Sequence, residues 1–489
     1  MSQSPTKPAP LSPARWLAWL ALLGFPLSLW LFWVGYLGSD DAIYWADSSA
    51  WLAHFPYVGN THWALRHTLV LPIVLARLAF GDTMLALTVP CLLYAAAALL
   101  VLRAWLARVA DPYATAAALV LVVCNPLLVV WSSTAAVDIV ELFFCCAGLA
   151  LYARAVARGP SWGTLLASGV LFGLAYLSRE TAAFAVAGIG LLFLAGFGFA
   201  RRWYLVMAAG FSALLLGEMA FLWAYTGNPL HRLAIAAHHD TTINRWDPNP
   251  NIAFTVHPAL DPVLMWFTGH YFALLGWIGL PLAVWLFWRG GLAGKARQAA
   301  IIFATVGASW TVAASALWTQ LPLTPRYFLL PTLCVSILAA LALRQLALRA
   351  RHRLALALFA LLLAGNLVAL ALDNRNYRYS EWALAELAAT TPGVLHADAE
   401  IHARAELLLA WRGVDARVVD TPPQAGELYV YDPTTHGPQP APSWTLLRRQ
   451  TPPASWAQRV LAPLAGRLPA SVWDKLGPRH PGVALYRVS

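Results

Sequence analysis

Two adjacent carboxylates stand where an ionised side chain could do chemistry. Asp40 and Asp41 follow directly on a long apolar run and precede Tyr44, Trp45 and Asp47 in a stretch of helical character. Ionised groups beside apolar segments are costly and need a reason. A carboxylate at such a position can remove the proton of an attacking hydroxyl group, as a general base does. The simpler interpretation is that the pair caps the start of a helix.

Basic residues of a kind that binds anions occur in two other places. His62, Arg66 and His67 form one cluster, in which His62 and Arg66 would share a face of a helix, and they suit an anion such as a lipid phosphate. Trp63 between them is also a common membrane-interface anchor. Arg326 precedes Tyr327 at the start of an apolar run. Such an arginine can extend its charge towards water, but its position is exceptional enough to predict an anionic partner.

Acidic residues open another apolar run. Asp138 and Glu141 are three positions apart, on one face of a helix. The helix dipole can account for Asp138 at the first turn, but Glu141 lies one turn deeper. The dipeptide Arg179-Glu180 between two further runs can be a turn with an internal ion pair.

A histidine-rich segment contains residue types that bind metals. His239 lies within His238-His239-Asp240, but no third ligand follows at a fixed spacing, so the metal signal is weak. The requirement for a divalent metal is left open, and no cofactor is assigned.

The composition shows what must position these residues. Of 489 residues, 60% are hydrophobic and 11% are charged, with a mean hydropathy of +0.60. A soluble globular chain is nearer half apolar and a quarter charged. This excludes a soluble enzyme, a disordered chain and a secreted disulfide scaffold. The five cysteines all lie in apolar runs without a CxxC pair, which indicates small core residues.

Eleven apolar runs have the length of membrane spans, which is about 17–25 residues. They lie near 16–37, 83–108, 114–131, 137–157, 162–177, 181–199, 203–225, 263–288, 298–318, 327–346 and 354–372. The first is too long for a signal-peptide core and is interpreted as a retained span. We see no paired, interrupted spans of the kind that transporters use.

The basic residues orient these spans. Fifteen of them gather at alternate ends of the runs: Lys7, Arg15, Arg103, Arg108, Arg154, Arg158, Arg201, Arg202, Arg289, Lys295, Arg297, Arg344, Arg349, Arg351 and Arg353. Basic residues concentrate on the cytoplasmic side of membrane proteins, so the N-terminus is predicted to be cytoplasmic and all the candidate site residues external.

The predicted fold class is therefore a mostly α, polytopic membrane bundle with a small external domain. The membrane module spans residues 1–373, with external loops at about 38–82 and 226–262, the first of which carries interfacial helices. Residues 374–489 are predicted to form a soluble α/β domain. Short apolar runs at 393–397, 416–419 and 427–431 read as strands, and 400–411 reads as a helix.

Several motifs make the chain resemble the GT-C superfamily of integral membrane glycosyltransferases. The similarity is to family 39, which includes protein O-mannosyltransferases and the aminoarabinose transferase acting on lipid A. The motifs are SDDAIYWADSSAW and PYVGNTHWALRHTLVLPIVLARLAFG in the first external loop, LSRET at 177–181, YTGNPLHRL at 225–233 and PRYFLLP at 325–331. That family often has Asp-Glu where this chain has Asp40-Asp41, which leaves open which acid does the chemistry.

The resemblance implies an inverting sugar transfer from a polyprenyl-phosphate donor to a hydroxyl of a lipid, glycan or protein. It implies a multi-pass protein of the bacterial inner membrane with its site facing the periplasm, surrounded by membrane lipids, and no nucleic-acid partner. Asp41 or Asp40 would be the base, Asp41 being preferred because Tyr44 and Trp45 continue its face. The donor phosphate would be held by Arg326, Arg66, His62 and Tyr327, and the acceptor by Asp138, Glu141, Tyr44, Arg179 and His239.

Two other functions are compatible with the sequence. One is a polytopic transporter or flippase of lipid-linked glycans, which would need polar groups in interrupted spans near the middle of the bilayer. The other is a GT-C-like scaffold without catalysis, which would tolerate the loss of both Asp40 and Asp41. The sugar, the acceptor and the oligomeric state are not specified by the sequence.

The distribution of basic residues predicts the topology of the chain. A reporter or cysteine label at Trp444, in the C-terminal tail, should be found outside the cytoplasm, whereas a label at Gly159 should be found inside it. Cytoplasmic labelling of Trp444 would overturn the orientation.

Overall fold

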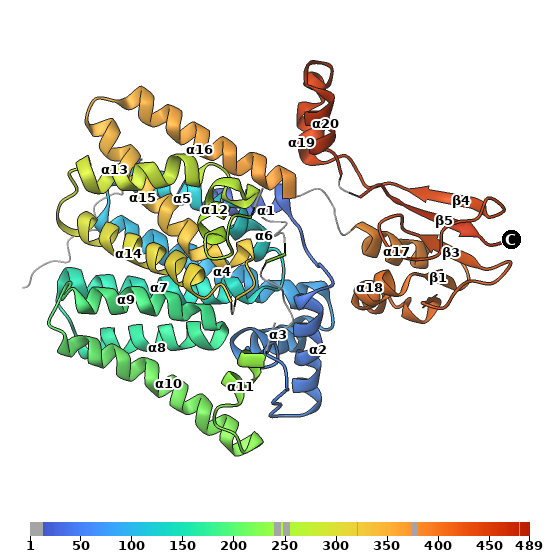
Figure 1. Cartoon of the computed structure of the whole chain (residues 1–489), viewed down its shortest axis with the longest axis horizontal. Coiled ribbons are helices and arrows are strands. Elements are labelled where there is room, and N and C mark those ends of the chain that lie inside the picture. Colours follow the sequence, from blue (N-terminus) through green and yellow to red (C-terminus); the bar gives the residue numbers. More distant parts are fainter. Residues whose placement is uncertain (1–12, 239–245, 248–254, 320, 374–378, 479) are drawn as a thin grey trace, which may run out of the picture.

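A computed structural model of the chain describes residues 13–238, 246–247, 255–319, 321–373, 379–478 and 480–489. Figure 1 shows a large bundle of helices with a small sheet-containing part beside one end. The predicted fold class is confirmed: the described chain is mostly helical, with several apolar spans and a small C-terminal sheet.

Most of the predicted spans are single helices. They are α1 (Pro13–Phe32), α4 (Met84–Val109), α7 (Val137–Arg158), α8 (Trp162–Ser178), α9 (Ala183–Leu194), α10 (Arg202–Thr226), α14 (Gly294–Ala316), α15 (Leu329–Leu348) and α16 (His352–Asp373). Within the described ranges, six helices are long and apolar enough to cross a membrane, or seven if one bent pair is counted as a span. The number eleven therefore stays a prediction.

Two predicted spans are interrupted, so the expectation of continuous spans is wrong for them. The run at 114–131 forms α5 (Pro112–Val123) and α6 (Pro126–Ser132), which are bent by 56°. The break falls at Asn125-Pro126, where proline cannot continue the helical hydrogen bonds and Asn125 caps the next helix. The run at 263–288 is divided into α12 (Asp261–Thr268), η2 (His270–Phe272), η3 (Leu275–Gly279) and α13 (Leu280–Arg289).

The first external loop contains the two predicted short helices. α2 (Asp40–Ala53) and α3 (His67–Phe80) have 14 residues each. At 1.5 Å per residue they are about 21 Å long, less than the thickness of about 30 Å of a bilayer core. Arg77 of α3 holds them together, since it lies 4.0 Å from the ring centroid of Trp45 and donates to Ser48 Oγ at 2.8 Å.

The segment before α3 is not helical. Residues 61–65 form turns and α3 begins only at His67, so the expectation that His62 and Arg66 share a helical face is wrong.

The predicted strands and helix of the tail are confirmed. They are β1 (Leu395–Ala397), α18 (Ala399–Trp411), β2 (Val418–Val419) and β3 (Leu428–Tyr431). The elements that the sequence did not predict are α17 (Tyr379–Thr390), β4 (Thr445–Gln450), α19 (Trp456–Leu461), α20 (Ala470–Leu476) and β5 (Val483–Arg487). The sheet has the order β2-β1-β3-β5-β4, in which β1 is parallel to both neighbours and β5 is antiparallel to both of its own.

The tail packs on the start of α2. The ring of Trp411, at the end of α18, lies edge-on to Tyr36 at 5.7 Å and to Trp45 at 5.2 Å between centroids. Gly38 has a φ of +63°, and a Cβ there would lie 2.6 Å from the carbonyl oxygen of Arg404 in α18. In Figure 1, α18 accordingly lies beside the upper part of α2. The boundary predicted at residue 374 stays a prediction, because 374–378 lie outside the described residues.

Glycines let α8 and α10 approach closely. A Cβ at Gly169 would lie 1.8 Å from the carbonyl oxygen of Met207, and one at Gly210 would lie 2.3 Å from that of Leu166. Gly173 follows four residues after Gly169 on the same face, a spacing typical of close helix contacts in membranes.

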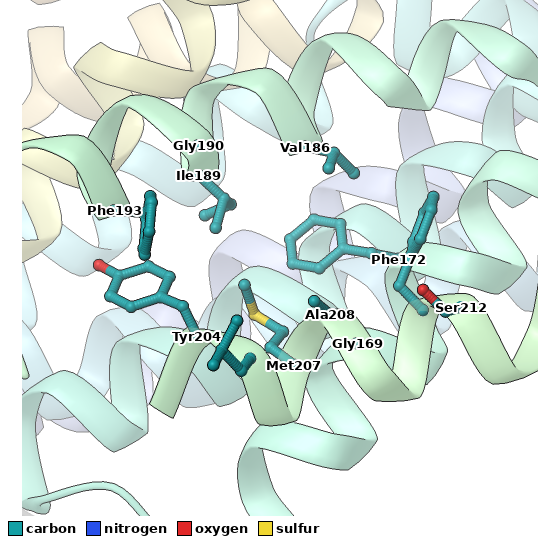
Figure 2. Close-up of a pocket in the computed structure, with 12 residues that line it drawn as sticks. Gly169, Phe172, Val186, Ile189, Gly190, Phe193, Tyr204, Met207, Ala208 and Ser212 are labelled. Carbon is teal, nitrogen blue, oxygen red and sulfur yellow. The ribbon is translucent and has the colours of Figure 1, made fainter. Parts of the chain in front are cut away.

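An apolar groove of about 290 Å³ opens between α8, α9 and α10. Figure 2 shows that Phe172, Ile189, Phe193 and Met207 point into it. Its lining contains no ionisable side chain except the phenol of Tyr204, whose oxygen is 2.7 Å from that of Tyr152. The groove therefore suits an apolar chain and is not a candidate for chemistry.

The glycine contacts predict a local effect on stability. Gly169→Ala should destabilise the protein by about 1–3 kcal/mol, because the methyl group must push the backbone of α10 away. Gly163→Ala in the same helix is the control, since a Cβ there meets nothing within 4 Å. Thermal unfolding in detergent should show a lower transition for Gly169→Ala alone, and equal transitions for both variants would refute the close contact.

Candidate active site

Charged side chains from separate elements meet at the end of the bundle next to the tail. The contributors are α2, the start of α7, η1 (Glu180–Ala182), the second half of α10, α11 (His231–His238) and η4 (Pro325–Phe328). Their ion pairs join residues as far apart as 40 and 326. The structure thus brings together groups that the sequence analysis could only list separately.

The Asp40–Arg326 pair is the accessible part of this cluster. Asp40 Oδ2 accepts a hydrogen bond from Arg326 Nη1 at 2.6 Å, and the two side chains are 21% and 24% exposed. Asp40 is thus the anionic partner predicted for Arg326. Burial alone would raise the pKa of Asp40, but the positive charge of Arg326, supported by Arg66 and Arg179, holds it below its usual value. Asp40 is therefore ionised and within reach of a ligand.

Asp41 holds the backbone that leads into α2. Its carboxylate accepts three backbone N–H groups, from Leu37 at 2.6 Å, Ser39 at 2.7 Å and Ala42 at 3.1 Å. The residue is only 3% exposed, and this burial raises the pKa of its carboxyl group in spite of the three hydrogen bonds. The geometry does not support the preference for Asp41 over Asp40 as the acid that faces the site.

Arg66 and Tyr44 lie behind Asp40. Arg66 Nη1 donates to the hydroxyl of Tyr44 at 2.6 Å, and the arginine is 5% exposed. Tyr44 is one turn after Asp40 on α2, so the positive charge of Arg66 acts on Asp40 without being hydrogen-bonded to it. His62 stacks on Trp63 with 3.7 Å between ring centroids.

Asp138, Glu141 and Arg179 form a buried layer beneath the accessible pair. Arg179 forms an ion pair with Asp138, and its guanidinium lies 3.9 Å from the ring centroid of Tyr327. Glu141 accepts a hydrogen bond of 2.7 Å from the hydroxyl of Thr181. The two acids lie on the same side of α7, as their spacing predicted, but exposures of 2% for Asp138 and 4% for Glu141 keep both from solvent.

Arg232 is the residue of this cluster that the sequence analysis missed. It donates to Glu218 Oε1 at 2.8 Å, to Glu180 Oε1 at 2.8 Å and to the carbonyl oxygens of Leu65 and Leu177. Arg179 and Glu180 thus have different partners, in contrast to the internal ion pair considered above. Arg232 stands in the YTGNPLHRL motif, which is the signal that could have identified it.

His239 and Asp240 of the histidine-rich segment lie outside the described residues. Among the residues that the structure does describe, no group of three or more His, Cys, Asp or Glu side chains could hold a metal ion.

Comparison with known proteins identifies the fold. Residues 67–224 match a family model described as dolichyl-phosphate-mannose-protein mannosyltransferase. The structure of ArnT from Cupriavidus metallidurans bound to undecaprenyl phosphate is similar, with a TM-score of 0.57 and 15% identity over 97% of this chain and 98% of ArnT. No curated protein matches the chain by sequence.

A more distant similarity is to an archaeal enzyme. The oligosaccharyltransferase AglB from Archaeoglobus fulgidus, in complex with an inhibitory peptide and a dolichol-phosphate, has a TM-score of 0.50 and 14% identity over 82% of this chain and 64% of AglB. The chain therefore has the GT-C fold, and the resemblance noted from the sequence motifs is confirmed at the level of the fold.

The two aspartates are predicted to differ in their contribution to stability. Asp41→Asn should destabilise the protein by about 1–3 kcal/mol, because an amide NH₂ group would replace one of the oxygens that accept backbone N–H groups. Asp40→Asn should cost less, since its single ion pair is partly exposed. Thermal unfolding of both variants tests this, and a larger loss for Asp40→Asn would contradict the assigned roles.

Proposed function

We propose that this protein is a glycosyltransferase that moves a sugar from a polyprenyl-phosphate donor to a hydroxyl acceptor, with inversion at the anomeric carbon. The observation that carries the proposal is the Asp40–Arg326 pair, an accessible carboxylate and guanidinium 2.6 Å apart at one end of a GT-C bundle. The similarity to a protein bound to undecaprenyl phosphate supports the donor class.

Asp40 is the proposed base. Its carboxylate takes the proton of the acceptor hydroxyl while the oxygen of that hydroxyl attacks the anomeric carbon of the sugar. The bond between this carbon and the phosphate oxygen breaks on the opposite face, and its electron pair leaves with the polyprenyl phosphate. Because a phosphate is already a stable anion when it leaves, the reaction needs no proton donor on that side.

Arg326 is the proposed donor-phosphate ligand. Its guanidinium matches the geometry of a phosphate, and charge-assisted hydrogen bonds of this kind are among the strongest in proteins. The same guanidinium binds Asp40, so the phosphate and the base are held by one group and lie close together. Arg66, although buried, adds positive charge beside them.

The remaining candidates are proposed to position the reacting groups. Asp138 holds Arg179, and Arg179 packs on Tyr327, the residue next to Arg326. Glu141 is as buried as Asp138, so neither acid is proposed to touch the acceptor. The acceptor is proposed to approach from the side of Asp40 that α2 presents to solvent.

The cellular location is part of the proposal. Fifteen basic residues at the opposite ends of the spans support a site on the non-cytoplasmic side, which is proposed to be the periplasmic face of a bacterial inner membrane. Since Trp411 packs on Trp45 of α2, the tail is proposed to share the compartment of the site.

A flippase of lipid-linked glycans is the second candidate. The observation in its favour is the pair of interrupted segments, α5–α6 and α12–α13. A transporter that binds the same lipid would depend on Arg326 but would not need a base, so the loss of Asp40 distinguishes the two functions. The same variant tests a scaffold without catalysis, which would tolerate it.

Removal of the base should abolish most of the transfer. We expect Asp40→Asn to lower kcat by on the order of 10²–10⁴-fold, the usual contribution of general-base catalysis, while donor binding is retained. The measurement is sugar transfer by the purified protein from a synthetic polyprenyl-phosphate sugar.

The matched control for this variant is Asp111→Asn. Asp111 pairs with Arg344 Nε at 2.9 Å near the C-terminal end of α15, and both this pair and Asp40–Arg326 are partly exposed. The control should transfer normally. Near-normal turnover in Asp40→Asn, Asp41→Asn and the double variant would refute the mechanism.

Removal of the guanidinium should weaken donor binding. Arg326→Ala should lose about 1.5–3 kcal/mol of charge-assisted binding, which is roughly a 10- to 150-fold higher Kd for a polyprenyl phosphate. Arg344→Ala, near the far end of the helix α15 that follows η4, should bind normally. If a folded Arg326→Ala variant bound the polyprenyl phosphate with unchanged affinity, Arg326 would not be the phosphate ligand, and Arg66 or His62 would be the next candidates.

A further inference from the structure

Four basic side chains surround a second pocket at the far end of the bundle. Arg108 of α4, Arg154 and Arg158 of α7 and Lys295 of α14 line a pocket of about 300 Å³, and all four are exposed. The pocket is lined by no acidic residue. Four cations therefore converge from three helices on one space.

Among the described residues, no carboxylate lines the pocket beside these cations. In the described part of the bundle, Asp111 is the acid nearest in sequence to Arg108. Its Oδ2 accepts from Arg344 at 2.9 Å, and its Oδ1 accepts the backbone N–H groups of Tyr113 and Ala114. Both oxygens of the Asp111 carboxylate thus already accept hydrogen bonds, one from Arg344 and the other from the start of α5. A ligand that fits the pocket must supply negative charge.

The rest of the pocket is apolar. Its wall includes Trp105 and five alanines, Ala104, Ala147, Ala150, Ala153 and Ala157. Trp105 stacks on Phe303 with 4.3 Å between ring centroids, which fixes the position of one side of the wall. The alanines leave room for a chain of methylene groups beside the cations.

We propose that this pocket binds an anionic phospholipid, with the phosphodiester among the four cations and an acyl chain along the apolar wall. Basic pockets between membrane helices on the cytoplasmic side bind such headgroups, because each cation near the surface contributes about 1 kcal/mol. A soluble phosphate would use the cations but would leave the apolar wall without a partner.

This site is separate from the candidate active site. Asp138 and Arg158 stand at opposite ends of α7, 20 residues apart, which corresponds to about 30 Å along a helix. A phosphate bound at Arg158 therefore cannot be the donor phosphate proposed at Arg326. The inference does not depend on the proposed enzymatic function.

The test compares two lipids and two double variants of the full-length protein in detergent. Native mass spectrometry should show that phosphatidylglycerol binds more tightly than phosphatidylcholine with the same acyl chains. Arg154→Gln combined with Arg158→Gln should weaken phosphatidylglycerol binding by about five-fold per cation, or roughly 25-fold in total. The control combines Arg351→Gln with Arg353→Gln, two exposed cations at the start of α16 that do not line the pocket.

The outcomes separate a lipid from other ligands. Equal affinity for the two lipids, or an equal loss in the control variant, would overturn the proposal. Ala147→Trp fills the apolar wall and should weaken phosphatidylglycerol binding while the affinity for glycerol phosphate stays unchanged. If glycerol phosphate displaces phosphatidylglycerol at equal concentration, the ligand is a soluble phosphate and the proposal fails. Retained unfolding temperatures exclude misfolding as the cause of any loss.

Discussion

The structure depends on one constraint, which is that a charge next to a bilayer cannot remain buried without a partner of opposite sign. Arg232 forms ion pairs with both Glu218 and Glu180, and it also donates a hydrogen bond to the carbonyl oxygen of Leu65. Arg179 likewise forms an ion pair with Asp138. Because each arginine is satisfied only when several segments are in place, charge neutralisation fixes the relative positions of α7, η1, α10 and α11.

Much of the fold could be predicted because it rests on local patterns. Length and hydropathy predicted the helices, and short apolar runs predicted β1, β2 and β3. The partners of the charges could not be predicted, since the ion pair of Asp40 with Arg326 joins residues 286 positions apart. The sequence also could not predict which of Asp40 and Asp41 faces the site. That depends on the backbone from Leu37 to Ser39, whose N–H groups turn towards the carboxylate of Asp41.

The charged side chains at the two ends of the bundle have different kinds of partner. At the end next to the tail, arginines and carboxylates neutralise one another within the protein, and Asp40 and Arg326 form the part that a ligand can reach. At the far end, Arg108, Arg154, Arg158 and Lys295 meet around a pocket without an acidic lining residue, and the counter-ion proposed for them is an anionic lipid. Under the two proposals, the same membrane provides a substrate at one face and a counter-ion at the other.

The packing of Trp411 on Tyr36 and Trp45 has a consequence for biosynthesis. A ribosome makes α2 early, whereas α18 emerges only after every predicted span has been made. A chain truncated after α16 would contain all the apolar helices. Because it would lack Trp411, it would leave Tyr36, and Trp45 of α2, without this contact. The insertion of the apolar helices into the membrane and the packing of Trp411 on Tyr36 and Trp45 are therefore separate events in the biosynthesis of this protein. The second must await the synthesis of α18.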